Sequence, residues 1–112
     1  MLTQDDYKQR IEVMRKACEM KDLDAVFIFA NENEPANVRY FTNYRPVFET
    51  TALIIPKSGE AVLLIGPETE TLAKDHSVIT TFKMLQSFRE TSDPEYPDIQ
   101  LDTFPEIFSE LN

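Results

Sequence analysis

Two short apolar runs separated by a four-residue turn place the strongest constraint on the fold of this chain. Residues 50–55 and 60–65 are rich in aliphatic side chains, and the connecting residues 56–59 include a proline and a glycine. Runs of this length with such a connection favour an antiparallel β-hairpin, in which Gly59 can adopt a positive φ. The chain is therefore expected to contain a β-sheet that includes this hairpin.

The N-terminal segment carries apolar side chains at steps of four, three and four: Tyr7, Ile11, Met14 and Cys18. This spacing predicts an amphipathic helix over residues 4–21. Thr3 is positioned to cap it, with Asp6 at the capping-box position and Asp5 near the positive end of the helix dipole. We interpret the two aspartates as helix-end residues, with metal ligation as the weaker alternative.

A helix followed directly by a strand is predicted for the first third of the chain. Residues 26–29 form a continuous apolar run, which predicts a strand that is buried on both faces. This order is typical of a layered α/β domain. Residues 31–35 are polar and end in proline, which predicts a turn. Residues 36–44 are predicted to form a short helix or turn, docked by Val38 and Phe41.

The second half of the chain mixes regular elements with an acidic segment. Residues 68–75 predict a short helix, and residues 78–85 predict a strand with apolar side chains on both faces. Residues 90–112 hold seven acidic and no basic side chains. We interpret them as an acidic connection, extended over residues 91–101, that leads into the start of a helix at Phe104. That helix is short, so its apolar face needs a cover.

Composition narrows the classes of function. The chain has 112 residues, enough for one domain, and a formal net charge of −9 at pH 7. So acidic a chain argues against binding to nucleic acid or to an anionic membrane surface. Its two glycines, Gly59 and Gly66, are too few for a Gly-rich phosphate or dinucleotide loop. Because the apolar runs are short and no apolar leader is present, we expect a cytoplasmic protein.

Few side chains are suited to catalysis. His76 is the one histidine, and we interpret it as a solvated residue at a helix end. Cys18 is the one cysteine and lies on the apolar stripe of the first helix, where a buried, inert thiol is expected. We therefore expect no catalytic residue and no metal ligand in this chain.

Aromatic residues and two arginines gather after the predicted turn: Arg39, Tyr40, Phe41, Tyr44, Arg45 and Phe48. Such a group near a proline turn can line a recognition surface. The alternative is that at least Tyr40 and Phe41 pack in the core. Of the two interpretations we expect core packing for Tyr40 and Phe41, with the recognition surface as the alternative.

Taken in order, these segments resemble the N-terminal domain of the creatinase, prolidase and aminopeptidase P family, the pita-bread metallopeptidases. The resemblance begins with Arg10 and Met14 on the first helix and continues through Leu-Asp-Ala at residues 23–25. Its most specific part is this strand entry followed by a motif with four members: Asn37, Tyr40, Phe41 and Thr42. The hairpin and the helix after it follow in the expected order.

The resemblance implies a three-layer α/β domain. Helices would pack on a mixed β-sheet that includes the antiparallel hairpin, in an arrangement similar to the ribonuclease H motif. Residues 1–112 would be a single N-terminal domain, with the catalytic C-terminal domain absent. That second domain would hold two divalent metal ions, Mn, Co or Zn, whereas this chain would hold no cofactor.

The resemblance also implies a function. The chain would be the non-catalytic N-terminal domain of an Xaa-Pro dipeptidase-like metallopeptidase, a hydrolase that acts on proline-containing dipeptides. It would assist dimerisation and substrate access, with Tyr44, Arg45 and Phe48 as candidate residues. Its partners would be its own catalytic domain and a second copy of the chain.

Two alternatives stay open, and the sequence departs from the family in two places. The chain could be a free-standing small α/β protein-interaction module, or the N-terminal domain of a creatinase-like hydrolase that is not a peptidase. Asn43 stands where the family usually has glycine. Asparagine tolerates the left-handed conformation, so the turn after residues 37–42 is expected to survive. The family often has an arginine shortly before the hairpin, where this chain has Glu49-Thr50-Thr51, and Arg45 is only a loose substitute for it.

Overall fold

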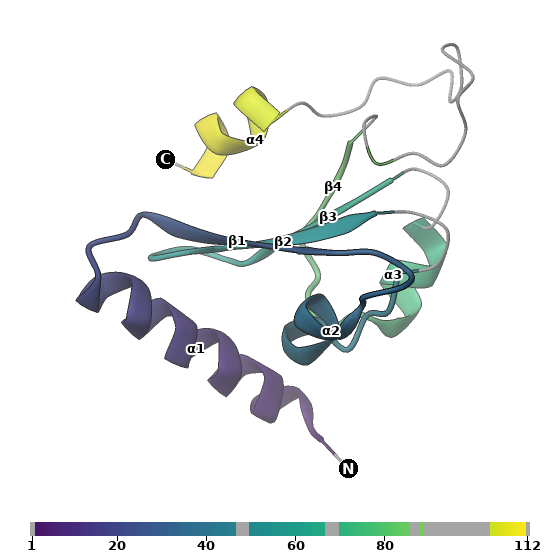
Figure 1. Cartoon of the computed structure of the whole chain (residues 1–112), viewed down its shortest axis with the longest axis horizontal. Helices are drawn as coiled ribbons and strands as arrows, with labels where there is room; N and C mark the ends of the chain where they lie inside the picture. Colours follow the sequence, from purple (N-terminus) through teal and green to yellow (C-terminus); the bar gives the residue numbers. More distant parts are fainter. Residues whose placement is uncertain (1, 47–49, 67–69, 86–87, 89–103, 112) are drawn as a thin grey trace.

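The computed structural model describes residues 2–46, 50–66, 70–85, 88 and 104–111. In chain order they form α1 (Gln4–Met20), β1 (Ala25–Ala30), α2 (Ala36–Thr42), β2 (Thr51–Pro56), β3 (Val62–Ile65), α3 (Glu70–His76), β4 (Phe82–Met84) and α4 (Phe104–Leu111). The sheet lies between two helical layers, with α1, α2 and α3 on one face and α4 on the other (Figure 1). The predicted three-layer α/β fold is confirmed. Among these helices, none is long and apolar enough to cross a membrane.

The four described strands lie in the order β1-β2-β3-β4. β1 pairs antiparallel with β2, and β2 pairs antiparallel with β3, whereas β3 pairs parallel with β4. The β2–β3 pair is the predicted hairpin. Gly59 in its turn has a φ of 92°, a conformation that L side chains rarely adopt. Both the mixed sheet and the hairpin are therefore confirmed.

β2 is at the centre of the packing, because all six of its residues are buried. Its successive side chains point to opposite faces of the sheet. On the α1 side they join one apolar cluster, which includes Ile11, Val38, Phe41, Leu53, Ile55, Leu63 and Ile65. On the α4 side they join a second cluster: Ala52, Ile54, Val62, Leu64, Leu85, Phe88 and Ile107. β2 therefore packs against both helical layers.

β1 is covered on one face only in part, and the prediction that it is buried on both faces is wrong. On the α1 side, Ile28 packs against the first cluster. On the α4 side, the side chains of Phe27 and Phe29 stay 45% and 52% exposed. Both side chains stay exposed because β1 is at the edge of the described sheet, where the rings of Phe104 and Phe88 cover only part of them.

The strand predicted at residues 78–85 forms only in its second half, as β4. The amide of Val78 instead donates to the carbonyl oxygen of Thr42, at the end of α2, over 2.8 Å. The amide of Ile79 donates to the hydroxyl of Ser77 over 3.0 Å. These bonds engage backbone groups that a longer ladder would need, so pairing with β3 begins later in the segment.

α1 begins at the predicted capping box. The Asp6 amide donates to the Thr3 hydroxyl over 3.3 Å, and the Thr3 amide donates to the Asp6 carboxylate over 2.8 Å. The backbone bond from Thr3, followed by its hydroxyl bond, holds the pKa of Asp6 below the ordinary value of 3.8. The apolar stripe of the helix is buried at Tyr7, Ile11 and Cys18, which confirms the expected burial of the thiol.

α2 confirms the short helix predicted within residues 36–44, with Val38 and Phe41 buried as expected. α3 confirms the next short helix, although its description starts at Glu70. The exposed position of His76 at the end of α3 also matches the prediction.

α4 confirms the helix predicted from Phe104, and the sheet itself supplies the cover that its apolar face needs. Ile107 is 1% exposed against the second cluster. Lys83 of β4 forms an ion pair with Glu110 of α4 at 2.6 Å. The acidic connection predicted over residues 91–101 lies outside the described residues.

The capping box predicts an acid-sensitive contribution of Asp6 to stability. Because the folded state lowers the pKa of Asp6, its carboxylate stabilises the fold above pH 3.8. That stability is lost as the pH falls through the lower pKa of the folded state. D6N removes this ionisation, so the difference in free energy of unfolding between wild type and D6N should shrink on acidification. Urea titrations between about pH 2 and pH 7 measure it.

D5N is the matched control, because Asp5 lies beside the capping box, which Thr3 and Asp6 form. The D5N variant should keep the acid-sensitive contribution of Asp6. Parallel loss of stability in wild type and D6N over the whole pH range would contradict the prediction.

Candidate functional site at the end of helix α2

The motif shared with the family lies on α2, and its four members divide between surface and core. Asn37 and Tyr40 are exposed, and the side chain of Tyr40 keeps 52% exposure. Phe41 and Thr42 are buried at 7% and 0%. The expectation that Tyr40 packs in the core is wrong, whereas that for Phe41 is confirmed.

Thr42 organises the exit from α2. Its hydroxyl donates to the carbonyl oxygen of Val38 over 2.8 Å and accepts from the amide of Tyr44 over 2.9 Å. Its carbonyl oxygen accepts from Val78, which ties the helix end to the segment before β4. A buried backbone amide without a partner costs free energy, so this one hydroxyl fixes the direction of the following loop.

Asn43 completes the turn in the left-handed conformation, with φ of 62° and ψ of 6°. Its amide donates to the carbonyl oxygen of Arg39 over 2.8 Å, as in a helix that ends with a left-handed residue. The turn therefore survives the replacement of the usual glycine, as expected.

Tyr40 lies on the surface, where Arg10 of α1 stacks on its ring. The guanidinium carbon is 4.0 Å from the ring centroid of Tyr40 and 5.2 Å from that of Tyr7. The same guanidinium donates to the carbonyl oxygen of Tyr40 over 2.7 Å. Stacking of this kind contributes about 0.5–1 kcal/mol at an exposed site. The Arg10 and Tyr40 of the resemblance thus join α1 to α2.

The three candidate residues after the motif do not share one surface. Tyr44 is 1% exposed and belongs to the apolar cluster on the α1 side. Arg45 is exposed. Phe48 lies outside the described residues. Of the two candidates that the structure describes, Arg45 is therefore the one whose side chain is accessible for contact with a substrate or a second subunit.

Arg45 lines a pocket of about 380 Å³ between the ends of α2 and α3. The other lining residues come from both helices and the turn: Arg39, Asn43, Leu72 and His76. Among the described residues that line it there is no acid, although the chain as a whole is acidic. Two guanidinium groups in such a setting suit a carboxylate or another anion.

Arg39 and Arg45 can be grouped from the sequence, whereas the position of His76 beside them cannot. His76 is distant in the chain, and α3 brings it beside the arginines. Within the described ranges, no salt bridge or side-chain hydrogen bond joins these three residues to an acid. The pocket is therefore a tertiary feature built from the ends of two helices.

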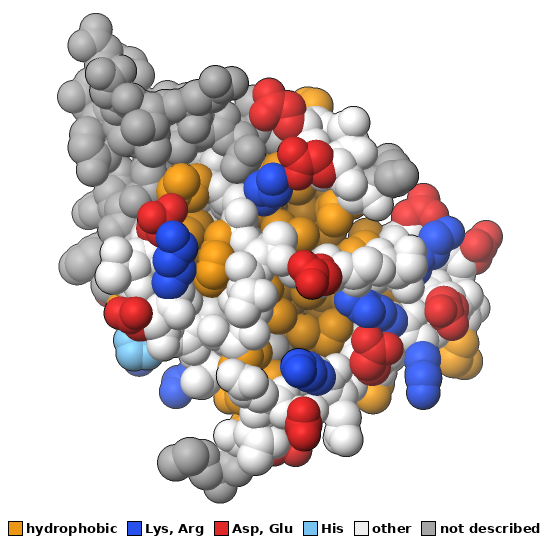
Figure 2. Space-filling model, turned by 180° about the vertical axis from the view of Figure 1, so that it is seen from behind, with side chains coloured by type: hydrophobic (Ala, Val, Ile, Leu, Met, Phe, Trp, Pro, Cys, Tyr) orange, Lys and Arg blue, Asp and Glu red, His pale blue; other side chains and the backbone are white. Residues whose placement is uncertain are grey.

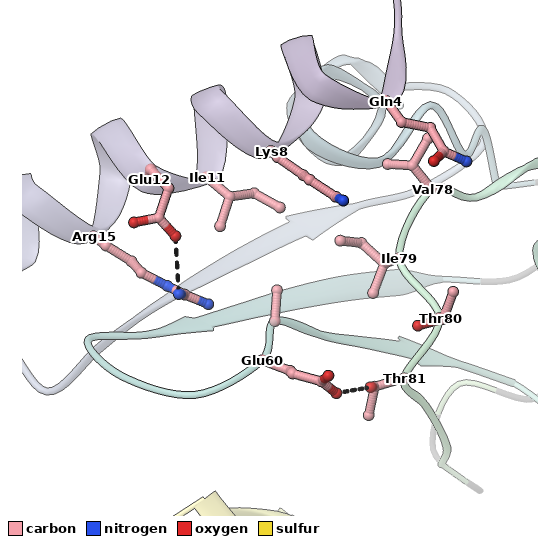
Figure 3. Close-up of a pocket in the computed structure, with 11 residues that line it drawn as sticks. Gln4, Lys8, Ile11, Glu12, Arg15, Glu60, Val78, Ile79, Thr80 and Thr81 are labelled. Atoms are coloured by element: carbon pink, nitrogen blue, oxygen red, sulfur yellow. Dashed lines mark hydrogen bonds and ion pairs between the residues drawn. The ribbon is translucent and has the colours of Figure 1, made fainter.

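A second hollow lies between α1 and residues 78–81 (Figure 3). It has a volume of about 390 Å³ and an apolar floor that includes Ile11 and Ile79. Its charged groups are mostly engaged with neighbours. Glu12 pairs with Arg15 at 3.0 Å, and the Thr81 hydroxyl donates to Glu60 over 2.7 Å. These contacts indicate a structural groove rather than a catalytic centre.

The described residues hold no recognisable reaction centre. No group of three or more His, Cys, Asp or Glu side chains among them is placed to hold a metal ion. Cys18 is fully buried in α1, away from the surface. On the face shown in Figure 2, Lys and Arg side chains intermingle with Asp and Glu.

A family model described as the Creatinase/Prolidase N-terminal domain matches residues 10–110 of the chain. No curated protein sequence matches it significantly.

Three solved structures resemble the fold at low sequence identity. The N-terminal domain of the cytoplasmic peptidase PepQ from Mycobacterium tuberculosis H37Rv has a TM-score of 0.61 and 20% identity, over 71% of this chain and 58% of that chain. Dipeptidase PepE from Mycobacterium ulcerans has a TM-score of 0.60 and 18% identity, over 75% and 23%. The prolidase from Pyrococcus horikoshii OT3 has a TM-score of 0.59 and 20% identity, over 70% and 20%. The chain thus spans less than two thirds of each of them.

The role of Thr42 predicts a specific effect of removing its hydroxyl. T42V keeps the shape of the side chain but leaves the Tyr44 amide without that acceptor, which should cost about 1–3 kcal/mol in free energy of unfolding. Amide hydrogen exchange should show faster exchange at Tyr44. T42S loses a methyl group but keeps the hydroxyl, so the Tyr44 amide should stay protected in that variant. Equal protection at Tyr44 in T42V and wild type would contradict the role assigned to Thr42.

Proposed function

Because the chain belongs to the creatinase/prolidase N-terminal domain family, we propose that it acts as the non-catalytic N-terminal domain of an Xaa-Pro dipeptidase-like metallopeptidase. The family match over residues 10–110 carries this proposal. Its support from structure is that the similar folds are N-terminal domains or parts of longer peptidase chains.

In this proposal the reaction belongs to a second, catalytic domain. Two divalent ions there, Mn, Co or Zn, would supply the activated water that cleaves the bond before proline. The described residues do not fit such a pair of ions, since no three or more of their His, Cys, Asp and Glu side chains lie together. No step of the hydrolysis is therefore assigned to these residues.

This domain would assist substrate access, because the pocket beside Arg45 would bind one end of the dipeptide. A dipeptide ends in a carboxylate, and guanidinium groups bind carboxylates through two parallel hydrogen bonds. Arg45 and Arg39 face a pocket whose described lining residues include no acid, which suits that end of the substrate. In a homodimer of the parent protein, this pocket would serve the active site of the neighbouring subunit. A cytoplasmic location would fit small peptides as substrates.

The first test asks whether this chain alone hydrolyses an Xaa-Pro dipeptide. This chain, incubated with Mn²⁺, Co²⁺ or Zn²⁺ and an Xaa-Pro dipeptide, should release no proline, as measured by a colorimetric proline assay. The gene should continue in frame after the codon for Asn112 into a domain with two Asp, one His and two Glu as metal ligands. Robust turnover by this chain alone would overturn the proposal.

The second test addresses Arg45 in the parent enzyme. R45A should raise KM for an Xaa-Pro dipeptide by about tenfold, because a hydrogen bond to a charged group is lost, while kcat changes little. K74A is the control, since Lys74 is an exposed cation of α3 that pairs with Glu70 at 3.4 Å and does not line the pocket. An unchanged KM in R45A would remove Arg45 from substrate binding but leave the domain assignment standing.

Two alternatives would give different outcomes. A stop codon directly after Asn112 would favour a free-standing α/β protein-interaction module. A following domain that hydrolyses creatine-like compounds but no Xaa-Pro dipeptide would favour the creatinase-like hydrolase.

A further inference from the structure

β1 presents an open sheet edge without the usual protection against pairing. Within the described sheet it has a strand neighbour only on the β2 side, and the residues Ala25–Ala30 include no charge and no proline. The other edge strand, β4, is three residues long and carries Lys83. Short length, charge and proline are the means by which edge strands avoid pairing with other chains. β1 has none of the three.

Within the described part of the chain, the edge is also accessible and apolar. No described helix or strand lies in front of β1 in Figure 1. Phe27 and Phe29 stay about half exposed on the α4 side, next to the rings of Phe88 and Phe104. A strand added to this edge would place its own side chains beside the two phenylalanines and cover them.

The register determines which backbone groups face the open edge. The Lys57 amide donates to the carbonyl oxygen of Asp24 over 3.0 Å, which makes these two a hydrogen-bonded pair of the β1–β2 ladder. Hydrogen-bonded pairs alternate along an antiparallel ladder. The groups directed toward β2 therefore belong to Val26, Ile28 and Ala30. Those directed outward belong to Ala25, Phe27 and Phe29.

We propose that β1 pairs antiparallel with β1 of a second copy of this chain, with the two Phe27 residues opposite each other. In this register Ala25 lies opposite the Phe29 of the second copy. All three outward-facing residues then form hydrogen-bonded pairs, and the two sheets join into one. The same three residues supply the backbone hydrogen-bond donors and acceptors on both sides of the interface, as a two-fold symmetric contact requires.

The side chains fit this register. Phe29 lies opposite the small side chain of Ala25, which leaves room for its ring, while the two Phe27 rings become neighbours across the two-fold axis. No charged residue of one strand meets a charged residue of the other, so the acidity of the chain does not oppose pairing within β1. The paired segment ends after Phe29, because the amide of Asn31 donates to the carbonyl oxygen of Glu34 over 3.4 Å.

The proposed function does not define the surface through which two copies of the chain would meet. Pairing through β1 supplies such a surface and does not depend on peptidase activity. An interface of one strand pair and four phenylalanines is small, so the dimer should dissociate on dilution.

Sedimentation velocity tests the pairing with the chain as it is. The wild type should shift from monomer to dimer between about 5 and 500 µM, as expected for a small interface. F27K and F27E should each weaken self-association by about tenfold or more, because like charges then lie opposite each other and the ring contact is lost. An equimolar mixture of F27K and F27E should recover dimer, because residue 27 faces its own counterpart. V13K is the matched control, since Val13 belongs to α1, on the other side of the sheet from Phe27 and Phe29, and is 68% exposed.

Amide exchange gives a second readout that needs no variant. At high concentration the amides of Ala25, Phe27 and Phe29 should gain protection, whereas those of Val26, Ile28 and Ala30 are already protected by β2 in the monomer. Circular dichroism confirms that the variants are folded. A wild type that stays monomeric would overturn the proposal and leave the edge to a strand of another protein. Dimerisation of F27K and F27E as strong as that of the wild type would overturn it as well.

Discussion

The burial of β2 on both faces is the constraint on which the rest of the fold depends. Its six residues leave no polar face, so the strand is stable only between two layers that exclude water. The helices α1, α2 and α3 supply one layer and α4 the other, each through a separate apolar cluster. The edge strands are under weaker constraint. β1 can leave aromatic rings half exposed and β4 can be short without exposing the centre.

Elements with a local signal in the sequence could be predicted, and those that depend on strand order could not. α1 follows from an apolar stripe and a capping box, and the hairpin follows from two runs and a turn with Gly59. The run at Phe27 and Phe29 gives the same signal at an edge as at the centre of a sheet, so its half-exposure was missed. The length of β4 depends on a bond from Val78 to Thr42, which no local pattern contains.

The candidate site shows the same division. Arg45 can be selected from the sequence, but the burial of the neighbouring tyrosines cannot be predicted from it. Tyr40, predicted in the core, lies on the surface under Arg10, whereas Tyr44 is buried. The pocket itself needs α3 to bring His76 beside the arginines, and only the tertiary fold supplies that juxtaposition.

The bond between the Val78 amide and the Thr42 carbonyl also bears on the order of events during synthesis. When α2 has just emerged from the ribosome, the Val78 amide that binds its last carbonyl group has not yet been synthesised. The hairpin and α3 must both be translated before that partner emerges. The hydrogen bond at the end of α2 can therefore form only after the hairpin has been made, although the helix itself is encoded early in the chain.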